Sequence, residues 1–146
     1  MAHVDAHSMA ALLGVKLRRD RHLDSLDLSS EVGKGLSVAA LDRLCRLIAP
    51  DDPRFRYRIA PKATHARRRQ GAGRLNPEES NRLTRLASIW ALALDVWNSE
   101  RAARRFLGEP HALLRNSIPR ELAIESNIGA RAVEDLLGGL KYGSAV

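Results

Sequence analysis

The fold of this chain is decided by the stretch from Leu75 to Trp97, which reads LNPEESNRLTRLASIWALALDVW. Its start has the signals of a helix N-terminus: Asn76 can cap with its side-chain oxygen, Pro77 suits the first helical position, and Glu79 lies where a capping box closes. Apolar residues then recur at steps of three and four and share one helix face: Leu83, Leu86, Trp90, Leu94 and Trp97. A second apolar row consists of Ile89, Leu92 and Val96. Because such a helix must be covered on more than one side, we expect it to be the spine of an all-helical C-terminal domain.

The composition favours helices and excludes several protein classes. Of the 146 residues, 45% are hydrophobic but only 4% are aromatic, so the core must come from aliphatic side chains, which suit helices better than sheets. No apolar run approaches the roughly 18 residues of a membrane span, and no secretory signal opens the sequence. The single cysteine excludes an internal disulfide. These features predict a cytoplasmic protein with no membrane association.

Positive charge is concentrated in the first half of the chain. Residues 1–73 carry 14 Lys and Arg against 8 Asp and Glu, whereas residues 74–146 carry 10 against 9. A basic surplus of this kind is expected where a protein meets an anion such as nucleic acid. The nearly neutral second half is better suited to contacts with protein.

Residues 1–28 show little pattern, and we treat them as an N-terminal extension. His3 and His7 have the i, i+4 spacing that could share a metal on a helix. No third ligand lies nearby in the sequence, so we predict neither a metal nor a cofactor. The next signals are Ser29 or Ser30, which can cap a single helical turn, and Ser37, which can cap a longer helix. That longer helix ends near Ile48, and its apolar face is Leu41, Leu44, Cys45 and Ile48.

Two further short helices are expected before residue 71. Asp51 or Asp52 can start one that ends near Ile59, and Pro61 opens the other, which spans residues 62–70. Two short helices across a tight turn, the second rich in basic residues, are typical of a helix-turn-helix. We therefore assign residues 29–73 to a DNA-binding domain and residues 74–146 to a second helical domain.

The second of these helices is the predicted recognition helix. Its polar and basic side chains suit a DNA groove: Lys62, Thr64, His65, Arg67, Arg68 and Arg69. Arginine can bind guanine edges or phosphates in a bidentate manner, while lysine mainly neutralises phosphates. The alternative is that the arginine run is a solvated segment leading into Gly71–Gly73.

Three more helices should follow the spine. Asn98 can cap a helix from Ser99 to Leu107, and Pro119 can start another that ends near Ile124. Residues 127–129 read as a joint, and the last helix is expected over residues 130–140. Its inward residues would be Val133, Leu136, Leu137 and Leu140.

The second half of the chain resembles the toxin-binding domain of the Xre/MbcA/ParS antitoxins. The segments that carry the resemblance keep their order and spacing from Leu75 to the end: LNPEESNRL (75–83), WNSERAARRFL (97–107), Pro110, IPREL (118–122), GARAVEDLL (129–137) and Tyr142-Gly143. The first half is similar, more loosely, to the Xre-like helix-turn-helix of the same proteins, chiefly in GLSVAALDRL (35–44).

The resemblance implies a type II antitoxin of a RES-Xre system. Such a protein binds a cognate RES-domain toxin that degrades NAD, occludes the active site of the toxin with its C-terminal region, and represses its own operon through operator DNA, usually as a dimer. The residues that we expect to touch the toxin lie in the last helix and tail: Arg131, Glu134, Lys141, Tyr142, Gly143 and Ser144.

Two other functions compete with this one. A plain helix-turn-helix transcriptional regulator would use its C-terminal domain only to dimerise. An enzyme is disfavoured, because no Ser/His/Asp, Cys/His or paired-carboxylate arrangement stands out and the histidines are scattered.

Overall fold

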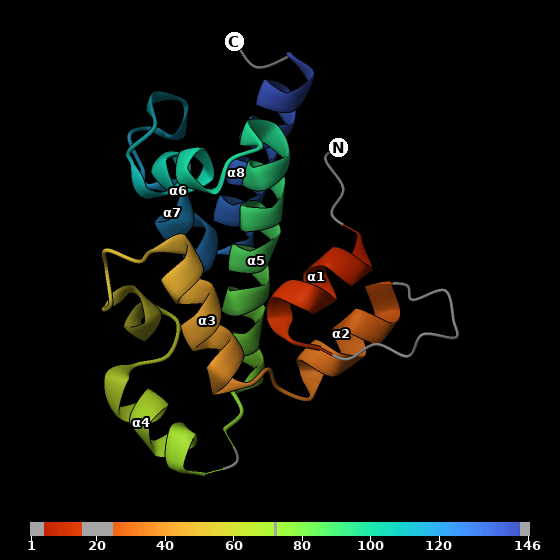
Figure 1. Ribbon diagram of the computed structural model, residues 1–146, viewed down its shortest axis with the longest axis vertical. Helices are drawn as coiled ribbons and strands as arrows, with labels where there is room; N and C mark the ends of the chain where they lie inside the picture. Colours follow the sequence, from red (N-terminus) through yellow and green to blue (C-terminus); the bar gives the residue numbers. More distant parts are fainter. Residues whose placement is uncertain (1–4, 16–24, 72, 144–146) are drawn as a thin grey trace. The chain divides into compact units, whose positions relative to one another are not determined.

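The computed structural model describes residues 5–15, 25–71 and 73–143, and the regular elements in these ranges are all helical, as expected. No strand occurs within those ranges; two isolated β-bridges join Ser37 to Arg74 and His111 to Ser117. The elements are α1 (Ala6–Leu13), α2 (Ser25–Gly33), α3 (Val38–Ile48), the 3-10 helix η1 (Phe55–Arg58), α4 (Lys62–Gln70), α5 (Pro77–Trp97), α6 (Glu100–Gly108), the 3-10 helix η2 (Ala112–Leu114), α7 (Pro119–Glu125) and α8 (Asn127–Tyr142) (Figure 1). None of the helices in the described residues is long and apolar enough to cross a membrane.

The chain divides into two compact units, and the division lies inside α5. The N-terminal unit is Asp5–Thr84, and the C-terminal unit contains Arg85–Val146. The sequence instead predicted the domain boundary after the glycines of the Gly71–Gly73 segment. The start of α5 belongs to the N-terminal unit because Leu36 N donates to Ser80 Oγ at 3.0 Å, and both residues are buried.

The N-terminal extension contributes α1 to this unit. Asp5 caps the helix by accepting from the backbone N–H of Ser8 at 2.9 Å, and this bond lowers the pKa of the Asp5 carboxyl. Gly14 ends the helix in the left-handed conformation, with φ of 68°. Leu13 is fully buried, and α1 contacts both α2 and α3. His3 lies outside the described residues.

Helix α3 confirms the predicted cap and apolar face. Ser37 Oγ accepts from Ala40 N at 3.0 Å, and the inward residues are buried: Leu41, Leu44, Cys45 and Ile48. The expected single turn at Ser29 or Ser30 is wrong, because α2 already begins at Ser25. The expected helix from Asp51 or Asp52 to Ile59 is also wrong. Only η1 forms there, since Asp52 Oδ1 accepts from Arg54 N at 3.2 Å and holds the preceding residues in a turn.

The segment that leads from α4 into α5 is joined by backbone hydrogen bonds to the turn between α2 and α3. Val38 N donates to Gly73 O at 2.7 Å, and Leu75 N donates to Leu36 O at 2.7 Å. Gly35 has φ of 97°, and a Cβ atom there would lie 2.6 Å from Leu75 O, so only glycine fits this close approach.

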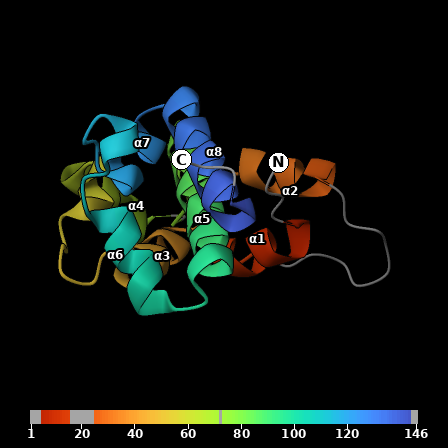
Figure 2. The same cartoon turned by 90° about the horizontal axis from the view of Figure 1, so that it is seen from above.

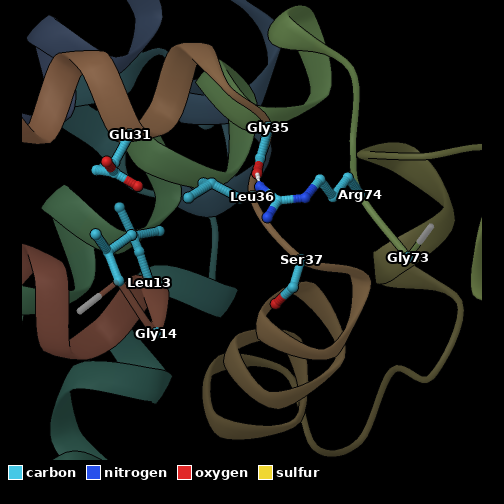
Figure 3. A pocket seen from close by; sticks show the side chains of 9 residues that line it. Leu13, Gly14, Glu31, Gly35, Leu36, Ser37, Gly73 and Arg74 are labelled. Atoms are coloured by element: carbon cyan, nitrogen blue, oxygen red, sulfur yellow. Dashed lines mark hydrogen bonds between the residues drawn. The ribbon is translucent and has the colours of Figure 1, made fainter.

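A pocket of about 310 Å³ opens beside this junction (Figure 3). Its two charged side chains are already paired within the unit: Arg74 Nη1 donates to Gly35 O at 3.1 Å, and Glu31 pairs with Lys34 at 2.9 Å. Both side chains thus already make contacts within the unit, and the pocket is part of the junction.

The spine helix α5 begins with the predicted capping box. Asn76 Oδ1 accepts from Glu79 N at 2.8 Å, and Glu79 Oε1 accepts from Asn76 N at 2.9 Å. Its apolar residues are buried as expected up to Trp90, with Ile89 and Leu92 also in the core. Toward its end the burial decreases, and Trp97 is 40% exposed.

The C-terminal unit is built by α6, α7 and α8 around the second part of α5. Ser99 caps α6 by accepting from Ala102 N at 3.2 Å. Asn98, which we expected to be the cap, instead makes the turn with φ of 50°. Arg85 caps the end of α7, because its guanidinium donates to Ala123 O at 2.9 Å and to Ile124 O at 2.8 Å.

Helices α7 and α8 contact each other along the N-terminal turns of α8 (Figure 2). The joint predicted at residues 127–129 is wrong, because Ser126 accepts from Gly129 N at 2.9 Å and α8 begins at Asn127. Gly129 is needed for packing, since a Cβ atom there would lie 2.2 Å from Leu122 O. The glycine that suggested a break in the helix thus allows a close approach of α8 to the backbone of α7.

Replacing Gly129 with alanine should destabilise the C-terminal unit. The added methyl group must displace the backbone of α7, and overpacking of this kind typically costs about 1–3 kcal/mol. Chemical denaturation followed by circular dichroism measures the loss. Gly33→Ala is the control, because no heavy atom lies within 4 Å of the point in α2 that its Cβ atom would occupy and alanine is a better helix former. Equal stability of the two variants would contradict the close contact.

Candidate functional site

The predicted recognition helix α4 presents three of its cationic side chains to solvent. Lys62, Arg67 and Arg69 are exposed, and Thr64 is half-buried. These three cations form no ion pair with any other described residue. No Asp or Glu occurs in the helix, so this surface has the uncompensated positive charge that phosphate binding requires.

His65 does not face a groove, and this part of our prediction is wrong. The residue is 5% exposed, and His65 Nε2 lies 2.8 Å from Asp42 Oδ1 in α3. The same carboxylate oxygen accepts from Arg56 Nη1 at 3.0 Å. The ring of Tyr57 meets the His65 ring edge to face, with 5.7 Å between the centroids. His65 therefore joins α4 to α3 and η1.

Arg68 is also used inside the protein. Its guanidinium pairs with the carboxylate of Glu79, which is 3% exposed at the start of α5. Arg68 Nη1 further reaches Arg74 O at 3.5 Å. Because Arg68 stands three residues after His65, the two side chains project from the same side of α4. We call this side, formed by His65 and Arg68, the anchored face.

The opposite side of α4 can meet another molecule, and the exposed Lys62 and Arg69 lie on the flank between it and the anchored face. A helix advances about 100° per residue, which puts Ala63, Ala66, Arg67 and Gln70 opposite the anchored face; all four are exposed. Small residues there let the helix backbone approach a ligand closely, and Arg67 stands beside them. Two more arginines are exposed nearby in the sequence: Arg54 directly precedes η1, and Arg58 is its last residue.

Two partners of the recognition helix, Asp42 and Glu79, were not recognised from the sequence. Asp42 gave a signal, because it stands on the buried side of α3 between Val38 and Cys45, at helical spacing from both. Glu79 gave none, since its capping function already explained its presence.

The residues expected to touch a toxin differ in their exposure. Arg131, Lys141, Tyr142 and Gly143 are exposed, and Tyr142 is 68% accessible. Glu134 is half-buried, and its carboxylate accepts from Ser88 Oγ at 3.3 Å. Lys141 pairs with Asp95 at 2.8 Å, which fastens the last turn of α8 to α5. Ser144 lies outside the described residues.

An open pocket of about 390 Å³ lies beside the last turns of α8. Leu140 forms one side, and a chain of aromatic rings forms another: Trp97, Phe106 and His111, with 5.9 Å and 5.6 Å between successive centroids. His111 Nδ1 accepts from Leu113 N at 3.1 Å, which orients the ring. Arg105 and Glu109 line the pocket and pair with each other at 3.3 Å. This is an apolar hollow with a charged rim, suited to a side chain of a partner protein.

Neither unit assembles recognisable catalytic chemistry from the residues that the structure describes. No group of three His, Cys, Asp or Glu side chains among them could hold a metal ion. Cys45 is buried in the core face of α3, as its position in the sequence predicted.

Comparison with known proteins assigns a class to each half of the chain. A family model for the antitoxin Xre-like helix-turn-helix domain matches residues 27–88, and a model for the antitoxin Xre/MbcA/ParS C-terminal toxin-binding domain matches residues 92–143. The protein Antitoxin Xre of Yersinia enterocolitica serotype O:8 / biotype 1B (strain NCTC 13174 / 8081) is 30% identical over 118 residues, which cover 80% of this chain and 79% of that protein. The first match ends and the second begins within α5, close to the division between the two units.

Proposed function

The chain belongs to the Xre/MbcA/ParS-type antitoxins, and on this premise we propose that it neutralises a RES-domain toxin that degrades NAD and represses its own operon. The antitoxin binds the toxin through the C-terminal unit and occludes its active site. The N-terminal unit binds operator DNA as part of a homodimer. No chemical step is performed by the antitoxin itself, and the protein acts in the cytoplasm.

The exposed side of α4 is the observation that supports DNA binding. Lys62, Arg67 and Arg69 supply charge for phosphates, and Arg67 is flanked by the small Ala63 and Ala66. Thr64 lies at the edge of this side and can add a polar contact. Because His65 and Arg68 are held inside the protein, we leave them out of the residues that touch DNA.

Arg67→Ala should weaken binding to a DNA fragment that carries the promoter of the operon by about 1–3 kcal/mol, the range for a directly contacting arginine. Fluorescence anisotropy at several salt concentrations measures the affinity. Arg101→Ala is the matched control, since Arg101 is an exposed arginine of the C-terminal unit and should leave the affinity unchanged. An Arg67→Ala protein that binds like the wild type would remove α4 from the DNA interface.

The end of α8 supports the mode of toxin binding that we propose. Tyr142 is a large, exposed side chain on the last turn, and Gly143 follows in the left-handed conformation, with φ of 71°. The pocket lined by Leu140 and the aromatic rings is a second apolar feature of the same unit. Exposed aromatic residues are typical of the residues that dominate protein interfaces. We propose that Arg131, Glu134, Lys141, Tyr142, Gly143 and Ser144 contribute to the contact.

Co-expression with the product of the neighbouring gene, followed by an NAD-depletion assay, tests the antitoxin function. A stable complex that stops the loss of NAD supports it. Retained promoter binding without any such complex would instead favour a plain transcriptional regulator. The mass of the free protein, measured by light scattering, tests the homodimer.

Tyr142→Ala should reduce neutralisation of the toxin at limiting antitoxin concentration, because truncation of a central interface aromatic typically costs about 2 kcal/mol or more. Ile128→Ala is the matched control: Ile128 is also a large exposed hydrophobic residue, 84% accessible, at the opposite end of α8. The dose of each variant that halves NAD loss is compared. If Ile128→Ala is impaired and Tyr142→Ala is not, the toxin contacts the start of α8 rather than its end.

A further inference from the structure

We propose that two buried carboxylates, Asp42 and Glu79, are positioning residues for DNA binding: they set the orientation of α4 and do not touch DNA. The inference rests on the proposed DNA-binding function and assigns to the protein interior a role in it. In this proposal His65 and Arg68 attach α4 to the rest of the unit, whereas their residue types suggest contact with DNA.

Asp42 holds two elements at one point. It is 8% exposed, and its Oδ1 accepts both from Arg56 in η1 at 3.0 Å and from His65 in α4 at 2.8 Å. Arg56 is itself oriented, because its Nε donates to Pro53 O at 3.1 Å. A buried charge-assisted bond of this kind is directional and poorly replaced by water. The carboxylate therefore fixes both the distance and the rotation of α4 relative to α3.

Glu79 fixes α4 at the next turn of the same face. Its Oε1 accepts from Asn76 N at 2.9 Å as part of the capping box, and it also pairs with Arg68. One carboxylate thus defines where α5 begins and where the second half of α4 lies. With two attachment points on a single face, at His65 and Arg68, α4 cannot rotate about its own axis without breaking one of them.

This rotation determines which residues face a ligand. Arg67 lies opposite the anchored face, and a turn of one residue spacing, about 100°, would replace it by a neighbouring side chain. Base and phosphate contacts require a defined register of the helix in the groove. Loss of an anchor should therefore reduce DNA affinity even though all exposed cations remain.

The sign of the effect separates positioning from direct charge effects. DNA is a polyanion, so removing a negative charge from its binding domain should strengthen binding or leave it unchanged. Removal of the negative charge should also strengthen binding if it frees Arg68 or His65 to contact DNA. A positioning carboxylate gives the opposite result, weaker binding after neutralisation.

The experiment neutralises one buried and one exposed acid at neighbouring positions in the full-length protein. Glu79→Gln removes the anchor of Arg68 and keeps a residue that can close the capping box; Glu78→Gln neutralises an exposed acid whose side chain is 75% accessible. Asp42→Asn and the exposed Asp51→Asn form a second pair. Affinity for the promoter fragment is measured by fluorescence anisotropy, below the melting temperature of every variant as determined by circular dichroism.

We expect Glu79→Gln and Asp42→Asn to bind about tenfold more weakly, the size expected for the loss of one charge-assisted bond, while both control variants bind as tightly as the wild type or more tightly. The double variant Arg68→Ala/Glu79→Gln should bind DNA no more weakly than whichever single variant has the lower affinity, because both substitutions remove the same Arg68–Glu79 ion pair. If Asp42→Asn melts below the assay temperature, the decision rests on Glu79→Gln and this double variant.

Unchanged or tighter binding by Glu79→Gln would overturn the proposal, as would fully additive losses in the double variant. A wild-type protein that does not bind the promoter fragment would instead refute the proposed DNA-binding function. The two failures are therefore distinguishable in one set of measurements.

Discussion

The structure depends on the need to cover α5. This helix is apolar around much of its surface, and Leu83, Leu86, Ile89 and Trp90 are buried on it. Burial of one such side chain contributes roughly 1.5–3 kcal/mol, so the exposed helix would be strongly disfavoured in water. The first part of α5 is covered within the N-terminal unit and the later part within the C-terminal unit. Each unit therefore has a core to which the same helix contributes.

Polar contacts then determine where the covering helices lie. In the N-terminal unit, the buried carboxylates of Asp42 and Glu79 hold α4, while Ser80 and backbone bonds hold the chain that enters α5. In the C-terminal unit, Arg85 satisfies the last carbonyl groups of α7, and Gly129 lets α8 approach that helix closely. Apolar burial favours a compact unit, whereas these bonds select one arrangement of its helices.

Sequence reasoning succeeded where a cap and an apolar period agreed. The Ser37 cap and the apolar face after it correctly predicted that α3 exists and where it begins. The capping box of Asn76 and Glu79, with the apolar face that follows, did the same for α5. It failed where the deciding contact came from far along the chain. Gly129 was interpreted as a break because its reason, the carbonyl of Leu122, is a tertiary contact. His65 was assigned to a groove because a histidine suited to DNA is equally suited to a buried carboxylate, and only the fold distinguishes the two. The family was recognised from the order of several motifs, none of which specifies the contacts made by a side chain.

The position of the division inside α5 restricts how this architecture can change during evolution. Where a flexible linker joins two domains, residues can be inserted or lost without altering either one. Here the join lies between Thr84 and Arg85, within a continuous helix. One residue inserted within either part of α5 would turn the apolar positions beyond it by about 100°, away from the core that covers that part. Length variation should therefore accumulate in the loops before and after α5.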